Sequence, residues 1–455
     1  MARKVFISFL GATNYGPCHY CTGDFDSGEK RFIQEATLDY LCQSGTWTKR
    51  DVAYILMTTD SRTMNWLSDG QRQYGTRRII RQPGLYSCLR ARKFPMTIKP
   101  VPGLPDGNTE DEVMTIFQKV FSLLKRGDEL YFDITHGFRY LPIVTIVMGN
   151  YSKFLKGVTV KMISYGNFEG RDRKTNRALI MDLTVLSTLQ DWANAAGSFI
   201  RSGDSSYLAQ LAKDKLLPIV IDNKRPDVQS ARTLNDLVKN LKEATTDMIT
   251  CRGQKIEGAE HIRGVKRHLN NLGDVVIQPM RPIIDKVKEE FADFNDKPDV
   301  MNGFHAVRWC LSHNLLQQAV TILRESVLSY FDERYQAKSI CAGLKMHVRR
   351  ELISKALRIL AENTPEDKWE VKPEHKPQVK AIVNALKSEK RAFTVTHSDG
   401  KKAHIAVTFK KVMEIRNDLD HNGMNDGPAP PAKLKDQTER YFERIYLCLA
   451  AHPLR

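Results

Sequence analysis

Short apolar runs separated by polar loops dominate the first 180 residues of the chain. The first run, Val5–Leu10, ends at a polar loop that opens with Gly11. Further runs of similar length follow at residues 52–57, 96–101, 130–132 and 158–163. Between them, apolar residues recur at the spacing of an amphipathic helix, most clearly after the capping pair Thr109 and Glu112. Strands that alternate with helices predict a parallel, doubly wound, Rossmann-like sheet.

A polar turn follows the fourth strand of this pattern. It contains Asp133, Thr135, His136 and Gly137, and an apolar helical pattern resumes at Arg139. In an open parallel sheet, ligands bind beyond the carboxyl ends of the strands, and backbone N–H groups at a helix start favour anions. The turn therefore lies where a binding or catalytic site is expected. For Asp133, the alternative is a structural hydrogen bond to a neighbouring turn.

The loop after the first strand completes this candidate site with Thr13, Asn14 and Tyr15. The hydroxyls and backbone N–H groups of this loop, with the Arg139 guanidinium, can form hydrogen bonds to phosphate oxygens. Tyr15 or Phe138 can stack on the face of a base. We therefore predict a phosphorylated ligand, with a histidine satisfied by its own backbone as the alternative at the turn. No G-x-G-x-x-G motif and no Walker lysine motif occurs, which argues against a dinucleotide dehydrogenase and a P-loop enzyme.

The pattern changes after residue 205, where almost every apolar repeat is helical. The exception is residues 393–409, where Ser398-Asp-Gly400 could turn a hairpin. The clearest helix starts at Leu316, and a final helix is expected over 436–450. We predict three parts: a sheet domain over 1–200, a helical connector over 201–300 and a helical domain over 301–455.

The chain carries a formal net charge of +16 and has a pI of about 9.4, which favours a polyanionic partner. One stretch, residues 70–105, contains eight basic residues and no acidic one. This stretch fits a solvated surface loop and, equally well, a positively charged rim beside a nucleotide or RNA site.

Eight cysteines without framework spacing fit a reducing compartment. Cys18-His-Tyr-Cys21 resembles half of a zinc site, but no second pair follows, so we expect a loop there and no metal. No apolar run approaches the ~20 residues that span a bilayer, and the N-terminus lacks the pattern of a signal peptide. We expect a cytoplasmic protein that does not bind membranes.

The candidate for chemistry in the helical half is Arg416-Asn-Asp-Leu-Asp-His421. Two other Arg/His pairs share this spacing, Arg263 with His268 and Arg308 with His313, and both are expected on a solvated helix face. The third pair differs because an apolar helix face leads into it and Gly423 follows closely. His421 is therefore expected at an accessible helix end.

Such a pair is the minimum set for metal-independent RNA cleavage. A histidine can move the proton of the 2'-hydroxyl or of the leaving oxygen, and an arginine can stabilise charge on phosphorus. One histidine does not easily serve as both base and acid. A two-fold dimer through the helical domain, with two copies of the pair facing each other, would remove this difficulty.

With these motifs in the order Thr135-His-Gly-Phe-Arg139 and then Arg416-Asn-x-x-x-His421, the chain resembles the CRISPR-associated CARF/HEPN ribonucleases of type III systems. The resemblance implies a dimer whose CARF domains bind a cyclic oligoadenylate, which activates HEPN domains that cut single-stranded RNA without a metal and leave 2',3'-cyclic phosphate ends. It places Arg416, His421 and Asn417 in the catalytic site. It assigns the messenger-binding loops to Gly11, Thr13, Asn14, Tyr15, Thr135, His136, Gly137, Phe138 and Arg139.

The resemblance further implies no required cofactor, a cyclic tetra-adenylate as the favoured activator, and no stable binding to the interference complex. Assembly beyond the dimer, RNA base preference and degradation of the messenger in the CARF pocket, as by a ring nuclease, stay open. Two other functions remain as alternatives. One is a nucleotide-sensing regulatory protein without nuclease activity, and the other is an enzyme that acts on a small phosphorylated substrate at Asp133 and His136.

Overall fold

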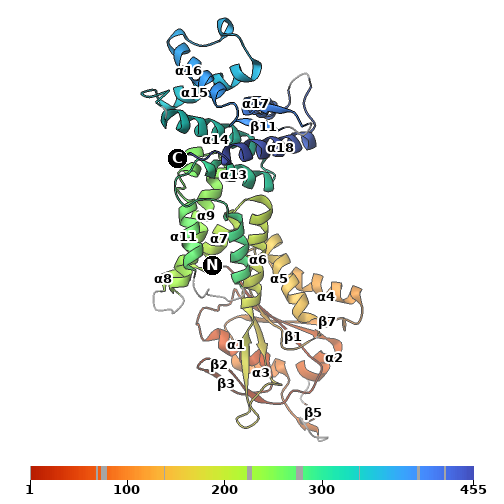
Figure 1. Ribbon diagram of the computed structural model, residues 1–455. Coiled ribbons are helices and arrows are strands. Elements are labelled where there is room, and N and C mark those ends of the chain that lie inside the picture. The colour runs from red at the N-terminus through yellow and green to blue at the C-terminus, as the bar shows by residue number, and fades with distance from the viewer. Residues whose placement is uncertain are drawn as a thin grey trace. The chain divides into compact units, whose positions relative to one another are not determined.

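The structure is a computed structural model that describes residues 2–67, 70–72, 79–137, 139–222, 228–272, 280–337, 339–396, 400–424 and 427–454. The chain forms two compact units, Met1–Gln190 and Asp191–Arg455 (Figure 1). Helix α6 (Thr184–Ser202) runs across the division between them.

The first unit is built on a sheet with a parallel centre. Within the described residues the sheet has eight strands in the order β3-β2-β10-β9-β8-β1-β4-β7. Its parallel strands are β9 (Thr159–Gly166), β8 (Glu129–Asp133), β1 (Lys4–Leu10), β4 (Val52–Thr58) and β7 (Thr97–Leu104). From β1 the chain moves outward through β4 to β7, and then crosses to β8 and β9 on the other side of β1. The strand order therefore reverses between β1 and β8, which is where open α/β sheets bind ligands.

Helices cover both faces of this sheet because its strands are apolar on both sides. Phe6 and Leu10 of β1 join a core with α1 (Ile33–Cys42) and α3 (Leu85–Arg92). Val5, Ile7 and Phe9 alternate with them and join a second core with α4 (Glu110–Leu123) and α5 (Leu141–Lys156). The predicted doubly wound, Rossmann-like arrangement is confirmed.

The edge of the sheet beyond β9 is not parallel throughout. β10 (Arg177–Asp182) runs antiparallel to β9. β2 (Cys18–Thr22) pairs with β10, and β3 (Phe25–Lys30) returns antiparallel to β2. The expected loop at Cys18–Cys21 is therefore wrong: it is a strand because its backbone pairs with a segment about 160 residues later. Both thiols are free and buried.

Short elements connect the main ones. Thr109 accepts a hydrogen bond from the Glu112 N–H at 3.3 Å, which confirms the predicted helix cap.

After β4 come α2 (Thr59–Ser61) and the π-helix η1 (Arg62–Trp66), and then the two-stranded pair β5 (Gly70–Arg72) and β6 (Ile79–Arg81). Much of the basic stretch, including Arg77 and Arg78, lies outside the described residues.

The second unit is helical, as predicted. Its first part contains α7 (Ser206–Lys215), α8 (Leu217–Ile221), α9 (Val228–Ile249), α10 (Gly253–Glu257), α11 (Ile262–Asn271) and α12 (Arg281–Glu290). Helix α9 packs against α7, α8 and α11. The separation of a connector at residue 300 stays a prediction.

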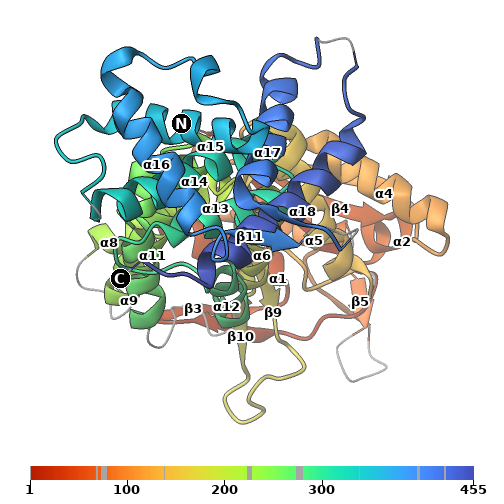
Figure 2. The same ribbon diagram turned by 45° about the horizontal axis from the view of Figure 1, so that its top comes forward.

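The remaining helices pack around α14 (Leu316–Ala337), which contacts α13 (Met301–Ser312), α15 (Met346–Glu362), α17 (Ile405–Asp420) and α18 (Pro431–Ala450) (Figure 1, Figure 2). Between α15 and α17 lie η3 (Glu366–Lys368), η4 (Pro373–His375), α16 (Lys376–Ser388) and the hairpin of β11 (Thr394–Thr396) with β12 (Lys402–His404). The predicted hairpin is confirmed, although residues 397–399 of its turn lie outside the described residues.

Two features are absent from the described residues. No helix there is both long and apolar enough to cross a membrane. No group of three or more His, Cys, Asp and Glu side chains in that part of the chain could hold a metal ion.

Candidate ligand pocket and catalytic helix

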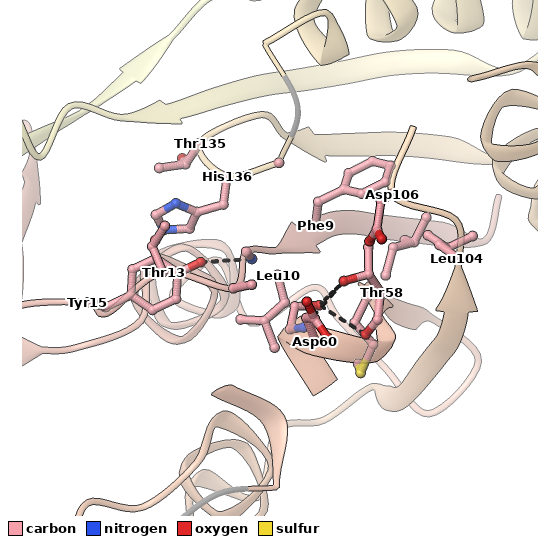
Figure 3. Close-up of a pocket in the computed structure, with 16 residues that line it drawn as sticks. Phe9, Leu10, Thr13, Tyr15, Thr58, Asp60, Leu104, Asp106, Thr135 and His136 are labelled. Atoms are coloured by element: carbon pink, nitrogen blue, oxygen red, sulfur yellow. Dashed lines mark hydrogen bonds between the residues drawn. The ribbon is translucent and has the colours of Figure 1, made fainter. Parts of the chain in front are cut away.

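A cavity of about 270 Å³ lies at the carboxyl ends of β1, β4, β7 and β8 (Figure 3). It spans the point where the strand order reverses. The residues that the sequence assigned to it and that line it are Gly11, Thr13, Tyr15, Thr135, His136 and Gly137. Asn14 and Arg139 do not line the cavity, and Phe138 lies outside the described residues.

Asn65 of η1 holds the loop after β1 in place. Its Nδ2 donates to the carbonyl oxygens of Gly11 at 2.8 Å and Thr13 at 2.9 Å. Arg31 in turn donates to the Asn65 Oδ1 at 3.3 Å. Because Asn65 follows the loop by about fifty residues, no local pattern in the sequence indicated its role.

Asp133 organises the turn after β8. Its carboxylate is completely buried and accepts from the Ser8 hydroxyl at 2.6 Å and from the Thr135 hydroxyl at 2.5 Å. The Thr135 oxygen also accepts from the Gly166 N–H at 2.7 Å. Burial raises the pKa of Asp133 above its usual range. The proton of Thr135 is committed to Asp133, so this hydroxyl shapes the turn and cannot also donate to a ligand.

His136 faces the cavity as a neutral ring. It packs against Tyr15 with 4.3 Å between ring centroids, and burial lowers the pKa of the imidazole to about 4. The Tyr15 hydroxyl accepts from the Gly11 N–H at 2.8 Å, so Tyr15 closes its own loop. The Nε2 atom of His136 is buried and has no hydrogen-bond partner among the described residues. The alternative of a histidine satisfied by its own backbone therefore does not describe Nε2.

Gly137 allows the chain to turn from this ring into α5. Its φ is +120°, and a Cβ there would lie 2.1 Å from the Leu141 Cδ1. The helix begins at Leu141 with a proline in its first turn, slightly later than the predicted start at Arg139. Arg139 itself is exposed.

The opposite end of the cavity was not predicted. Thr58 is the last residue of β4, Asp60 and Ser61 follow that strand, and Asp106 follows β7. Each lies at or just beyond a strand end, and that position is the signal that could have pointed to them.

Arg416, Asn417 and His421 lie on or directly after α17. His421 is the exposed residue that ends the helix, and its N–H donates to the Asn417 carbonyl at 3.0 Å. Arg416 is about one-third exposed, and its guanidinium forms an ion pair of 2.7 Å with Asp420. Asn417 lines a separate groove of about 360 Å³ between α15 and α17. The accessible helix end agrees with the sequence analysis, but a role in catalysis stays a prediction.

The other two Arg/His pairs have different surroundings. Arg263 is exposed and donates to the Asp296 carbonyl at 3.0 Å. His313 is buried, packs against Trp309 with 4.2 Å between ring centroids, and forms a hydrogen bond of 2.7 Å with the Trp309 carbonyl. The expectation of a solvated face is wrong for His313, because this residue ends α13 and packs back against the apolar Trp309.

Comparison with known proteins gives the first unit a family. Residues 5–169 match the model described as "CRISPR system endoribonuclease Csx1, CARF domain". The N-terminal unit is a CARF domain. The curated "CRISPR-associated protein MJ1674" of Methanocaldococcus jannaschii is 24% identical over 244 residues, which cover 51% of this chain. The match spans only about a third, 34%, of that relative's length.

One solved structure resembles the whole chain weakly. It is described as "Enterococcus italicus Csm6 bound to cyclic hexa-2'-fluoro-hexa-dAMP". The superposition covers 99% of this chain and 94% of the other, with a TM-score of 0.44 and 11% identity.

The buried carboxylate predicts a stability test of the CARF domain. Asp133→Ala should lower the free energy of unfolding by about 2–4 kcal/mol, because the buried Ser8 and Thr135 groups lose their acceptor. Asp133→Asn keeps an oxygen there and should cost about 1 kcal/mol. Urea unfolding followed by circular dichroism measures both. Asp182 is the matched control, since it accepts from Thr184 in the same Asp-x-Thr pattern but is exposed; an equal loss in Asp182→Ala would contradict a special role for Asp133.

The His136 pKa predicts a pH dependence. The folded domain disfavours the protonated ring, whereas the unfolded chain binds a proton below its ordinary pKa of 6.5. The contribution of the neutral His136 ring to the free energy of unfolding is therefore complete above pH 6.5. It is lost as the pH falls from 6.5 through about 4, by roughly 2–3 kcal/mol. His136→Asn should lack this loss, so the wild-type advantage in unfolding temperature should shrink on acidification.

Asp133 is present in both the wild type and His136→Asn. Its contribution to the pH dependence of stability, which has the opposite sign, therefore cancels when the two proteins are compared. His347 is exposed and serves as the control. His347→Asn should keep the wild-type pH profile, and a constant difference between wild type and His136→Asn from pH 7 to pH 4 would refute the assignment.

Proposed function

We propose that this chain is an endoribonuclease whose CARF domain senses a cyclic oligoadenylate and whose helical unit cuts single-stranded RNA with Arg416 and His421. The observation that supports sensing is the cavity at the strand-order switch of the CARF domain, which is lined by His136, a residue whose buried Nε2 has no partner among the described residues. A buried nitrogen without a partner is unusual, and a bound ligand would supply one.

The pocket favours hydrogen bonding over charge at its His136 end. A neutral imidazole has one donor and one acceptor nitrogen, so it can bond a phosphate or a ribose without carrying a positive charge. Thr13 lies at the same end and offers a further hydroxyl. This end suits a ribose-phosphate segment that is held by shape and hydrogen bonds.

The support for RNA cleavage is the position of His421 at an exposed helix end, with Arg416 earlier on the same helix. The histidine would move the proton of the 2'-hydroxyl or of the leaving oxygen, and Arg416 would stabilise the charge on phosphorus. A metal has no part in this scheme, and the products would carry 2',3'-cyclic phosphates. Asn417 would support the pair from the preceding turn.

The spacing of the pair favours a dimer. Five residues along an α-helix correspond to a rotation of about 140°, so Arg416 and His421 do not share one face of α17. Two copies related by a two-fold axis would bring the arginine of one chain and the histidine of the other to one phosphate. The helical unit would then form part of the contact.

A second surface for this dimer lies on α5. Ile143, Val147 and Phe154 form an exposed apolar stripe at helical spacing, and Phe154 is 87% exposed. Another copy of the CARF domain would cover the stripe, because α5 starts at the His136 turn and a two-fold contact there places two pockets together. A ring-shaped ligand with repeated units matches such a paired site.

Cleavage is predicted to depend on His421. Labelled single-stranded RNA with EDTA and cyclic tetra-adenylate should be cut by the wild type, and His421→Ala should cut at least about 100-fold more slowly because the proton-transfer group is lost. Gel analysis of initial rates measures this. His268→Ala is the matched control, since His268 follows Arg263 at the same spacing. Retained cleavage in His421→Ala, or none in the wild type with any ring size, would refute the proposal.

Dimerisation is predicted to depend on the stripe. Phe154→Glu should shift the protein from dimer to monomer, or weaken the dimer at least about tenfold, because the charge loses its water at the contact. Sedimentation velocity over a concentration series measures the change. Ile221→Glu is the control, because Ile221 is 71% exposed but lies on α8, outside the stripe. If Phe154→Glu sediments like the wild type, the stripe is not the contact.

A further inference from the structure

A carboxylate on the same helix holds the guanidinium of Arg416. Asp420 is the last residue of α17, and its Oδ2 lies 2.7 Å from the Arg416 Nη2. The two side chains share one side of the helix, because four residues correspond to a rotation of about 40°. Asp420 also directly precedes His421. The carboxylate therefore contacts one member of the proposed catalytic pair and is next to the other in the chain.

The stability of α17 does not account for this ion pair. The C-terminal end of a helix carries a partial negative charge, so an acid in the last turn is unfavourable there. An arginine that precedes its acid by four residues is also the less favourable order for a pair on a helix. Both side chains are partly exposed, and exposed ion pairs stabilise a fold little. The helix gains little from Asp420, so the contact is better explained by what it does to Arg416.

The position before the histidine separates this Arg/His pair from the other two of the same spacing. Arg267 stands four residues after Arg263, and Ser312 stands four residues after Arg308. A carboxylate occurs at this position only in the pair that the proposed function uses.

The ion pair leaves Arg416 able to bind a phosphate. Its Nε is enclosed and has no hydrogen-bond partner among the described residues, so Nε and Nη2 do not grip the carboxylate together. A guanidinium has five N–H donors in a planar fork, and one carboxylate does not use them all. Asp420 can therefore fix the plane of the group while other donors remain for phosphate oxygens.

We propose that Asp420 is a positioning residue for RNA cleavage. It fixes the guanidinium of Arg416 in the orientation that stabilises the charge on phosphorus. An arginine side chain has many rotamers, and a side chain that is already held does not have to be ordered in the transition state. The inference rests on the proposed function and adds a residue that acts through Arg416.

Single-turnover cleavage of labelled single-stranded RNA by the full chain, with EDTA and cyclic tetra-adenylate, tests this role. Asp420→Asn should lower the maximal rate about tenfold and change the enzyme concentration for half-maximal rate less than about threefold, because the orientation matters most in the transition state. Asp420→Glu should restore most of the rate, since a glutamate at this position can also pair with Arg416.

A double-mutant cycle separates an effect through Arg416 from a direct effect on His421. In the Arg416→Ala background, Asp420→Asn should change the residual rate less than about twofold, because the group that it positions is absent. Excess enzyme and long incubation make the slow residual rate measurable. A further tenfold loss in that background would overturn the assignment.

Asp436→Asn is the matched control. Asp436 and Arg440 form a pair of the same spacing on α18, with 2.6 Å between Oδ2 and Nη2, and this variant should keep the wild-type rate. Unfolding temperatures should confirm that all variants fold.

Three results would overturn the assignment alone. A faster Asp420→Asn would mean that the carboxylate blocks Arg416 from the phosphate. An unchanged rate would mean that the ion pair has no part in cleavage, and an equal loss in Asp420→Glu would mean that the negative charge is not what matters. Absence of RNA cleavage by the wild type with any ring size is distinct from these, because it would overturn the proposed function and this assignment with it.

Discussion

The buried carboxylate of Asp133 is the constraint on which the candidate pocket depends. It lies where the strand order reverses, and it ties β1, through Ser8, to the turn after β8, through Thr135. Thr135 then fixes the end of β9 through the Gly166 N–H. A carboxylate is costly to bury unless hydrogen bonds satisfy it. Because these bonds converge on one point, they hold in place the turn that carries His136 to the cavity.

The fold was predictable wherever a strand is buried on both faces. Such strands are continuous apolar runs. Val5–Leu10 and the similar runs can therefore be predicted as strands from their own sequence, before the strands that pair with them are known. β2 and β3 were missed because their pairing depends on β10, which arrives from the far end of the CARF domain. The pocket residues likewise divide into those that the sequence predicted and those that it did not. Tyr15 and His136 follow strand ends and were found, whereas Asn65 meets the first loop only through the packing of η1.

The amino-acid composition of the chain did not predict the charge of the residues that line the pocket. The chain carries a net charge of +16, which suggests a site rich in cations for an anionic ligand. The described lining instead contains a neutral histidine and two carboxylates. Net charge reports on long-range attraction of a polyanion to the whole surface, whereas a local site selects by the donors and acceptors it places. Under the proposed function, the excess positive charge would therefore serve attraction of RNA more than recognition of the messenger.

Two histidines with opposite surroundings belong to the two proposed functions. His136 is largely enclosed, and burial lowers its pKa to about 4, which suits binding, because a ring that stays neutral near pH 7 keeps one pattern of donor and acceptor. His421 ends α17 in contact with solvent, which suits a group that must exchange protons during turnover. The link between them would start at α5, because this helix begins at the His136 turn and carries the exposed stripe. A helix moves as a rigid body, so a ligand that shifts the turn also shifts the stripe, and a dimer contact there would pass the shift to both chains.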